Sequence, residues 1–352
     1  MKLRLAMYDR KFSVLFERYF QALTRTLEAP AFSRFVLEAR DLLQDLSLRG
    51  GKRMRVALLH EAARLVTDEP VAGLDEAALS IKLLQTHALI HDDIIDNSPT
   101  RRGGPSTYYA YRARLPHHPQ AALGLALLAG DLALNLSQQV LMDSAATLAL
   151  RHGMVGIQLH AARAMFTGQI ADMERDFTSL PDEDMLHSVA EYKSARYSAL
   201  APMQLGLLAA GERPTRFHTA LHRYTRSIGI SEQMRDDYQD LYGDAAAMGK
   251  PTGTDIRDGR RNYAVRAILT AATDEERALV ESILGSPDCT DAEISAVADV
   301  GRRHDVPREL REQMRHFAQQ AAAEAASWRH HWREDAVAFF ERLPAWSLER
   351  TS

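Results

Sequence analysis

The 352-residue sequence lacks several features, and each absence removes a class of protein. It has one cysteine, Cys289, so no intrachain disulfide can form and nothing points to an oxidising compartment. A formal net charge of -4 gives no reason to expect a nucleic-acid surface. The most apolar stretch, 121–136, contains Asp131 and Asn135 and is shorter than the roughly 20 residues of a membrane span. We expect a soluble cytoplasmic protein with no membrane span and no nucleic-acid partner.

Strand-like alternation of apolar and polar residues is also missing, so we expect no strands beyond short pieces. Helical periodicity takes its place, because apolar residues recur at i, i+3, i+4 and i+7, clearly so from Leu79 to Ile90. No low-complexity linker or repeat of fixed period interrupts the chain. We therefore predict an all-α fold, with residues 1–352 in a single helical domain around a central cavity.

The first chemical motif is the aspartate-rich run Asp92-Asp93-Ile94-Ile95-Asp96, which follows an apolar helical stripe. Carboxylates at i and i+4 lie on one helix face, and such close like charges destabilise a helix unless a cation joins them. Hard oxygen ligands suit Mg²⁺. A solvated acidic helix end would explain this motif equally well if it stood alone.

A paired arginine, Arg101-Arg102, follows this motif in a glycine-rich turn. Arginine binds phosphate in a bidentate manner, so two arginines beside a carboxylate–magnesium cluster indicate a diphosphate site. The presence of this arginine pair favours a catalytic role for the first aspartate motif over its interpretation as a solvated helix end.

A second aspartate motif, with Asp236, Asp237 and Asp240, repeats the spacing 144 positions later. The glycine-rich segment that follows carries Lys250 and Arg260, and its glycines allow close approach of the backbone to an anion. A flexible surface loop would explain the glycines but not a second aspartate run beside them.

A third basic segment, with Gly51, Lys52 and Arg55, precedes an apolar helix expected over 56–66. Helix N-termini attract anions, so this segment is a candidate diphosphate site without a metal. A charged helix start on the surface is the alternative, and the segment alone favours it.

Together these segments resemble the polyprenyl synthetase family of trans-isoprenyl diphosphate synthases. The matching stretches occur in the family's order and are 50–55, 85–96, 101–103, 130–131, 168–169, 192–194, 233–240 and 249–260. The resemblance implies an isoprenoid-synthase helical bundle, usually a homodimer, that condenses an allylic diphosphate head-to-tail with isopentenyl diphosphate. The allylic substrate would be dimethylallyl, geranyl or farnesyl diphosphate, and the cofactor would be Mg²⁺.

The resemblance also implies a role for each matching residue. The magnesium ligands would be Asp92, Asp96, Asp236 and Asp240, with Asp93 and Asp237 completing the catalytic motifs. The allylic diphosphate would contact Arg101, Lys193, Ser194, Gln233, Lys250 and Arg260, of which Lys193 and Lys250 are also catalytic. Isopentenyl diphosphate would contact Gly51, Lys52, Arg55, Gln85 and Arg102.

Four positions depart from the family's pattern, and they concern the allylic pocket. Arg260 stands where lysine is usual and Ser194 where threonine is common. Glu232 stands where phenylalanine is frequent, and Arg235 directly precedes the second motif.

Product length depends, by the same resemblance, on the residues four and five before the first aspartate, which are Ala88 and His87. Two aromatics there would indicate a C15 product, and two small residues very long chains. We predict geranylgeranyl diphosphate (C20), with C25 next. The alternative functions are a class I terpene cyclase, which shares the first motif, and a non-catalytic partner subunit, although such subunits generally lose one motif.

Overall fold

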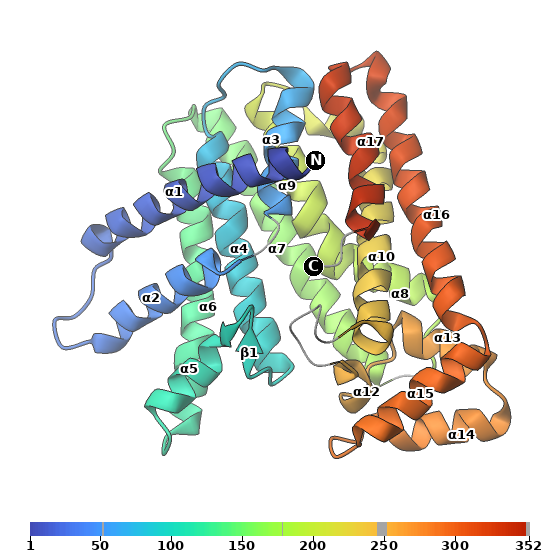
Figure 1. The fold of residues 1–352 in the computed structure, drawn as a ribbon. Coiled ribbons are helices and arrows are strands. Elements are labelled where there is room, and N and C mark those ends of the chain that lie inside the picture. Colours follow the sequence, from blue (N-terminus) through green and yellow to red (C-terminus); the bar gives the residue numbers. More distant parts are fainter. Residues whose placement is uncertain (51–52, 178, 245–251, 350–352) are drawn as a thin grey trace. The chain divides into compact units, whose positions relative to one another are not determined.

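The computed structural model describes residues 1–50, 53–177, 179–244 and 252–349 (Figure 1). The all-α prediction is confirmed, since the strands of these ranges are one pair of two-residue segments. The chain divides into two compact units, residues 1–162 with 201–216 and residues 163–200 with 217–352. The single-domain organisation stays a prediction.

The first unit is built mainly from long amphipathic helices. In order they are α1 (Lys2–Thr26), α2 (Arg34–Leu48), α3 (Met54–Val66), α4 (Leu74–Ile95), α5 (Thr107–Arg114), α6 (Pro119–Met142), the start of α7 (Leu148–Asp176) and α9 (Ala201–Ala209). The strands β1 (Thr100–Arg101) and β2 (Gly104–Pro105) lie between α4 and α5, and the 3₁₀ helix η2 (Pro214–Phe217) follows α9. In α1 the buried residues Tyr8, Phe12, Phe16 and Phe20 recur every four positions, so one stripe faces the core.

Helix α4 lies at the centre of this unit beside α6 (Figure 1). Its residues 77–87 are buried without interruption, because α3, α6 and α9 all pack against it. Small residues on α6, among them Ala122, Ala126 and Ala129, are buried and let neighbouring helices approach closely. A helix held on several sides is a rigid support for the aspartates at its end.

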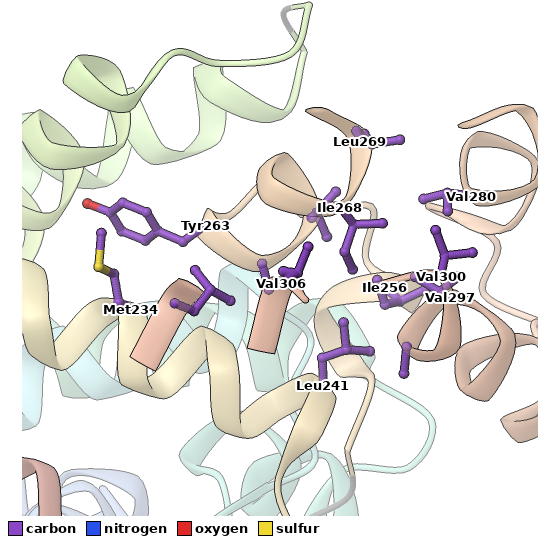
Figure 2. Close-up of a cluster of buried hydrophobic side chains, with 14 of the residues drawn as sticks. Met234, Leu241, Ile256, Tyr263, Ile268, Leu269, Val280, Val297, Val300 and Val306 are labelled. Atoms are coloured by element: carbon purple, nitrogen blue, oxygen red, sulfur yellow. The ribbon is translucent and has the colours of Figure 1, made fainter. Parts of the chain in front are cut away.

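The second unit contains the remaining helices. They are the end of α7, α8 (Glu183–Val189), the π-helix η1 (Ala190–Leu200), α10 (His218–Tyr242), α12 (Thr254–Arg257), α13 (Tyr263–Ala271), α14 (Asp274–Ile283), α15 (Asp291–Arg303), α16 (Val306–Ala326), the 3₁₀ helix η3 (Ser327–His330) and α17 (Glu334–Glu349). Figure 2 shows part of its core, where Met234 and Leu241 of α10 join Ile256, Ile268 and Val297 from later helices.

Helix α6 contains the most apolar stretch of the sequence. Its 24 residues make it, within the described ranges, the one helix long and apolar enough to cross a membrane by length and composition. Core helices pass the same test, and α6 packs against α2, α4 and α5. The apolar stretch 121–136 lies within this helix, which extends six residues beyond Leu136, and the finding is consistent with the expectation of no membrane span.

Candidate active site

The first aspartate motif lies at the C-terminal end of α4, which continues without a break to Ile95. Arg101 binds two of its carboxylates, with Nε 2.6 Å from Asp93 Oδ1 and Nη2 3.1 Å from Asp92 Oδ2. We predicted that Arg101 contacts the substrate. The structure places it on the motif itself, where its charge offsets the repulsion between adjacent aspartates.

A tight hairpin holds Arg101 in this place. Arg102 and Gly103 both have positive φ, 52° and 75°, which is the backbone of a two-residue type I′ turn between β1 and β2. The Arg49 guanidinium donates to the carbonyls of Arg101 and Pro105 at 3.1 and 2.7 Å. A Cβ at Gly104 would lie 2.6 Å from Arg49 Cζ, so this glycine is required for the contact.

Asp93 differs from its neighbours because its side chain is fully buried. Burial raises the pKa of Asp93 to about 6, although the nearby Arg101 opposes the shift. Its Oδ2 atom is buried and, within the described residues, has no hydrogen-bond partner. The motif therefore offers carboxylate oxygens, one of them unsatisfied, and oxygen donors of this kind suit a hard cation such as Mg²⁺.

A cluster of positively charged side chains lies around Lys82, which precedes Asp92 by ten residues on α4. Lys82 is 3% exposed and its Nζ donates to Gln85 Oε1 at 3.1 Å. Burial lowers the pKa of Lys82 well below its ordinary value, and the charges of Arg102, Arg53 and Arg55 add to the effect. The structure thus brings together three residues predicted for isopentenyl diphosphate, namely Arg55, Gln85 and Arg102.

Arg53, another cation whose charge acts on Lys82, is held by three hydrogen bonds of its own. Arg53 donates to Asp9 Oδ1, Ser47 O and Leu48 O, so it anchors the start of α3. Gly51 and Lys52 lie outside the described residues, and their predicted role is not tested. Lys82 was not predicted as a site residue, because it lies within an apolar helical run, where a lysine belongs to no recognisable motif.

The second aspartate motif lies near the end of α10, and its three carboxylates have different surroundings. Asp236 is 59% exposed in its side chain and pairs with Arg235 at 2.8 Å. Asp237 is buried and accepts from Gln233 Nε2 at 2.8 Å and Tyr263 N at 3.1 Å. Burial raises the pKa of Asp237 above its ordinary range. Gln233, predicted to contact substrate, therefore orients the motif in this structure.

Asp240 holds the segment that follows the motif. Its carboxylate accepts from Thr254 Oγ1 at 2.6 Å and from Asp255 N at 3.0 Å, and its carbonyl accepts from Gly253 N at 2.7 Å. These bonds cap the short helix α12. Lys250 lies outside the described residues, so its predicted contact is not tested.

A third set of carboxylates, which we did not predict, lies on α7. Asp172 binds Lys193 Nζ at 2.6 Å and Arg175 Nη1 at 2.5 Å. Asp176 binds Arg260 Nη1 at 2.9 Å and Arg175 Nη2 at 3.0 Å. Burial alone would raise the pKa of Asp172, but the charges of Lys193, Arg175 and Arg260 outweigh it and lower the pKa.

This network joins the predicted residues Lys193 and Arg260, which are 67 positions apart in sequence, through two aspartates of one helix face. The i, i+4 spacing of Asp172 and Asp176, which begins three residues after Gln169, was the signal that could have revealed them. Cations held by buried carboxylates are oriented before any ligand arrives.

Lys193 and Ser194 lie in η1, a π-helix of 11 residues. Wide π turns are rare and occur often at functional sites. Helix α7 approaches this backbone closely, since a Cβ at Gly168 would lie 2.1 Å from Lys193 N. Ser194 is half-buried in this segment.

Two departures from the family's pattern have a structural explanation in the second unit. Arg235 Nη1 donates to Ser347 O at 2.7 Å, and Ser347 Oγ donates to Glu232 Oε1 at 2.7 Å. Glu232 and Arg235 therefore tie α10 to α17 instead of completing an apolar pocket wall.

The predicted chain-length residues lie one turn before the first motif. His87 is 2% exposed and its Nδ1 is 2.9 Å from Gly130 O of α6, whereas Ala88 is half-buried. Burial lowers the pKa of His87 to about 4, so the ring is neutral at pH 7. The regular course of α4 is confirmed; the role of both residues in product length stays a prediction.

The two aspartate motifs belong to different compact units, so their meeting across one cavity also stays a prediction. Comparison with known proteins adds independent information. Residues 38–300 match the family model described as polyprenyl synthetase. The chain belongs to the polyprenyl synthetase family.

Among its relatives, the short chain isoprenyl diphosphate synthase of Methanocaldococcus jannaschii is 30% identical over 260 residues, which cover 72% of this chain and 73% of that protein. The farnesyl diphosphate synthase of Geobacillus stearothermophilus is 31% identical over 237 residues, 65% and 74% of the two chains. A crystal structure of geranylgeranyl pyrophosphate synthase from Corynebacterium glutamicum, complexed with isoprenyl diphosphate and magnesium, has a TM-score of 0.87 at 26% identity and covers 97% of this chain and 98% of its own. This polyprenyl synthetase is therefore an enzyme, a prenyltransferase of the short-chain isoprenyl diphosphate synthase type.

Proposed function

We propose that the protein condenses isopentenyl diphosphate head-to-tail with an allylic diphosphate, with Mg²⁺ as cofactor. The observation that carries this proposal is the presence of both carboxylate-rich sites and a cation-rich site. The aspartate motifs suit a diphosphate bound through metal ions. The cluster of Lys82, Arg55 and Arg102 lies beside Gln85 and suits a diphosphate bound directly. Two diphosphates bound in two ways are what a condensation needs and a cyclisation does not.

The magnesium ligands would be Asp92 and Asp96 at the end of α4 and Asp236, with Asp240, at the end of α10. The unsatisfied Asp93 Oδ2 and the adjacent carboxylates supply a donor set of hard oxygens for this cation. Bound magnesium would neutralise the charge that develops on the departing diphosphate. The relative solved with magnesium and isoprenyl diphosphate supports this assignment.

The cationic side chains would hold the same leaving diphosphate. Lys193 and Arg260 are fixed by Asp172 and Asp176, so they contribute charge at defined positions with little loss of side-chain entropy on binding. Arg101, held on the first motif, would turn one face of its guanidinium to the substrate. The single-domain organisation of residues 1–352 is part of this proposal.

For the product we propose geranylgeranyl diphosphate. The supporting observation is the size of the pair His87 and Ala88, one medium and one small side chain before the first aspartate. A C25 product is the next candidate, and C15 is favoured by the relatives named farnesyl diphosphate synthase.

The test is product chromatography after incubation with labelled isopentenyl diphosphate and, separately, dimethylallyl, geranyl and farnesyl diphosphate. A dominant C20 product from every accepted primer supports the proposal. A product that halts at C15, or one of C40 or longer, contradicts it.

We also propose that the enzyme is a homodimer. Large apolar side chains on α6 and the first half of α7 are exposed in the single chain, among them Leu128 at 65% and Leu148 at 70%. Such residues gather where protein surfaces associate. Light scattering should give twice the 39.4 kDa chain mass, and a monomer at micromolar concentration would contradict the assignment.

A further inference from the structure

Three potential metal ligands lie together in the first unit outside both aspartate motifs. They are His87 and His91, one turn apart on α4, and Asp131 on α6. Each offers one ligand atom, and these atoms all lie within 4.8 Å of one another. The two imidazole ring centres are 4.3 Å apart, and His91 Nε2 is 3.4 Å from Asp131 Oδ1.

The His87 ring is oriented like that of a metal-binding histidine. A ligating imidazole usually donates its second N–H to a carbonyl, which fixes the tautomer and directs the other nitrogen to the metal. His87 Nδ1 is 2.9 Å from Gly130 O, a carbonyl of α6. With Nδ1 engaged in this way, Nε2 is the atom that the His87 ring would offer to a metal.

The Nε2 atom of His91 faces a carboxylate in an arrangement that a cation would explain. It is buried and, within the described ranges, makes no hydrogen bond. An imidazole lone pair 3.4 Å from a carboxylate oxygen is repulsive unless a proton or a metal ion lies between them.

Gly130 makes this arrangement possible. A Cβ at this position would lie 2.4 Å from His91 Nε2, so any side chain would displace the ring. The glycine before Asp131 thus lets α4 and α6 approach until the two histidines and the aspartate meet.

We propose that His87, His91 and Asp131 form a binding site for a divalent transition-metal ion, with Zn²⁺ as the preferred ion and Co²⁺ and Ni²⁺ as substitutes. Two imidazoles and one carboxylate are typical ligands of these ions, whereas Mg²⁺ prefers an all-oxygen set. Zinc bonds to nitrogen and oxygen are about 2.0–2.2 Å long, so the ligand atoms of a tetrahedral site lie roughly 3.4 Å apart. The Asp131 side chain is 60% exposed and free to move toward the rings, and water would complete the coordination.

This site is distinct from the magnesium motif, although His91 directly precedes Asp92. A metal bound here would link α4 to α6 and hold the His87 ring at the chain-length position. Because the ion binds the folded chain, it would raise the midpoint of thermal unfolding, and the midpoint would rise with the logarithm of the metal concentration once that concentration exceeds the Kd.

Cobalt is the probe that separates the two kinds of site. The full-length protein is treated with chelator, exchanged into buffer with millimolar Mg²⁺, and titrated with Co²⁺ while visible absorption is recorded. We expect one Co²⁺ per chain with the intense d–d bands of a four-coordinate nitrogen and oxygen site. Octahedral Co²⁺ on carboxylates and water absorbs only weakly.

Matched variants assign the ligands. Asp131→Asn changes an exposed side chain and His87→Ala a buried one, and each should weaken Co²⁺ binding by more than the 10- to 100-fold typical of an outer-shell change. His160→Ala is the control, because His160 is exposed and its Nδ1 also contacts a backbone carbonyl, Gly156 O at 2.7 Å. It should bind Co²⁺ like the wild type.

The double variant Asp92→Asn/Asp96→Asn removes the magnesium motif and should retain the intense bands. Either of two results would overturn the proposal. One is loss of the bands in this double variant alone, and the other is equal Co²⁺ affinity in wild type, Asp131→Asn and His87→Ala. Either result would leave the proposed condensation untouched, since activity is not the readout.

Discussion

Gly168 of α7 lies against the backbone of Lys193 in η1, and a Cβ atom on Gly168 would come within 2.1 Å of the Lys193 amide nitrogen. The obstacle is backbone, which cannot rotate away as a side chain does. Lys193 can therefore keep its position, and its bond to Asp172, only because residue 168 is a glycine and carries no Cβ methyl group.

Gly168→Ala should destabilise the protein by about 1–3 kcal/mol through overpacking and lower the turnover number by moving Lys193. The same change at Gly156, also in α7, meets no atom within 4 Å and should stabilise by roughly 0.5–1 kcal/mol through helix propensity. Thermal unfolding and steady-state kinetics of both variants check the pair. Equal behaviour of the two would show that the contact is unimportant.

Asp92→Asn and Asp96→Asn should each lower the turnover number on the order of 10²-fold or more, because each removes a carboxylate proposed to bind magnesium. The magnesium concentration needed for half-maximal activity should rise as well. Asp75→Asn, at the other end of the same helix, removes an exposed carboxylate paired with Lys11 and serves as the control. Near-normal kinetics in the first two variants would exclude the motif from catalysis.

Lys82→Met should affect binding of one substrate only. Removal of a cation from the Arg55–Arg102 cluster should raise the KM for isopentenyl diphosphate about tenfold, or ~1.4 kcal/mol, and leave the KM for the allylic substrate unchanged. Lys11→Met, which changes an exposed lysine of the same unit, is the control. An equal effect on both KM values would place Lys82 outside the isopentenyl site.

The same variant should make the free protein more stable, with a defined pH dependence. The folded-state pKa of Lys82 is lowered by burial, so protonation favours the unfolded chain. The resulting penalty in wild type grows as pH falls from 10.5 toward the folded pKa and is constant below it. Denaturant unfolding at several pH values should show that the free energy of unfolding of Lys82→Met rises relative to that of wild type as the pH falls through this window. An unchanged difference would contradict the presence of a buried cation.

His87→Ala should lengthen the products, because the ring that reaches Gly130 O would leave space beside α4. The assay is run with magnesium after chelator treatment, so that no other metal contributes, and His160→Ala is the control. An unchanged product distribution would place the stop deeper along α4, near Leu84.

The parts of the site that could be predicted from sequence are those set by local spacing. The i, i+4 aspartates and the Arg101-Arg102 turn need only helix geometry and turn chemistry. The structure places the aspartates at the end of α4 and the arginines at a turn, whose type I′ geometry was not predicted. The assignment of Arg101 to the substrate missed its bonds to Asp92 and Asp93, because those depend on how the turn folds back.

Features that depend on long-range packing could not be predicted. Lys82 looks like an interruption of an apolar stripe until Arg55 and Arg102 are placed beside it. The role of Asp240 as a cap for Thr254 and Asp255 requires the course of the chain after α10. The π-helix at Lys193 has no distinct apolar period, so only the structure reveals it.

The most direct test of the account is elongation itself, measured with labelled isopentenyl diphosphate and farnesyl diphosphate in magnesium and in EDTA. Wild type should form geranylgeranyl diphosphate with magnesium and nothing with EDTA, and Asp92→Asn and Asp236→Asn should each lose the reaction. A cyclised hydrocarbon, or no consumption of isopentenyl diphosphate in the presence of magnesium, would contradict the account.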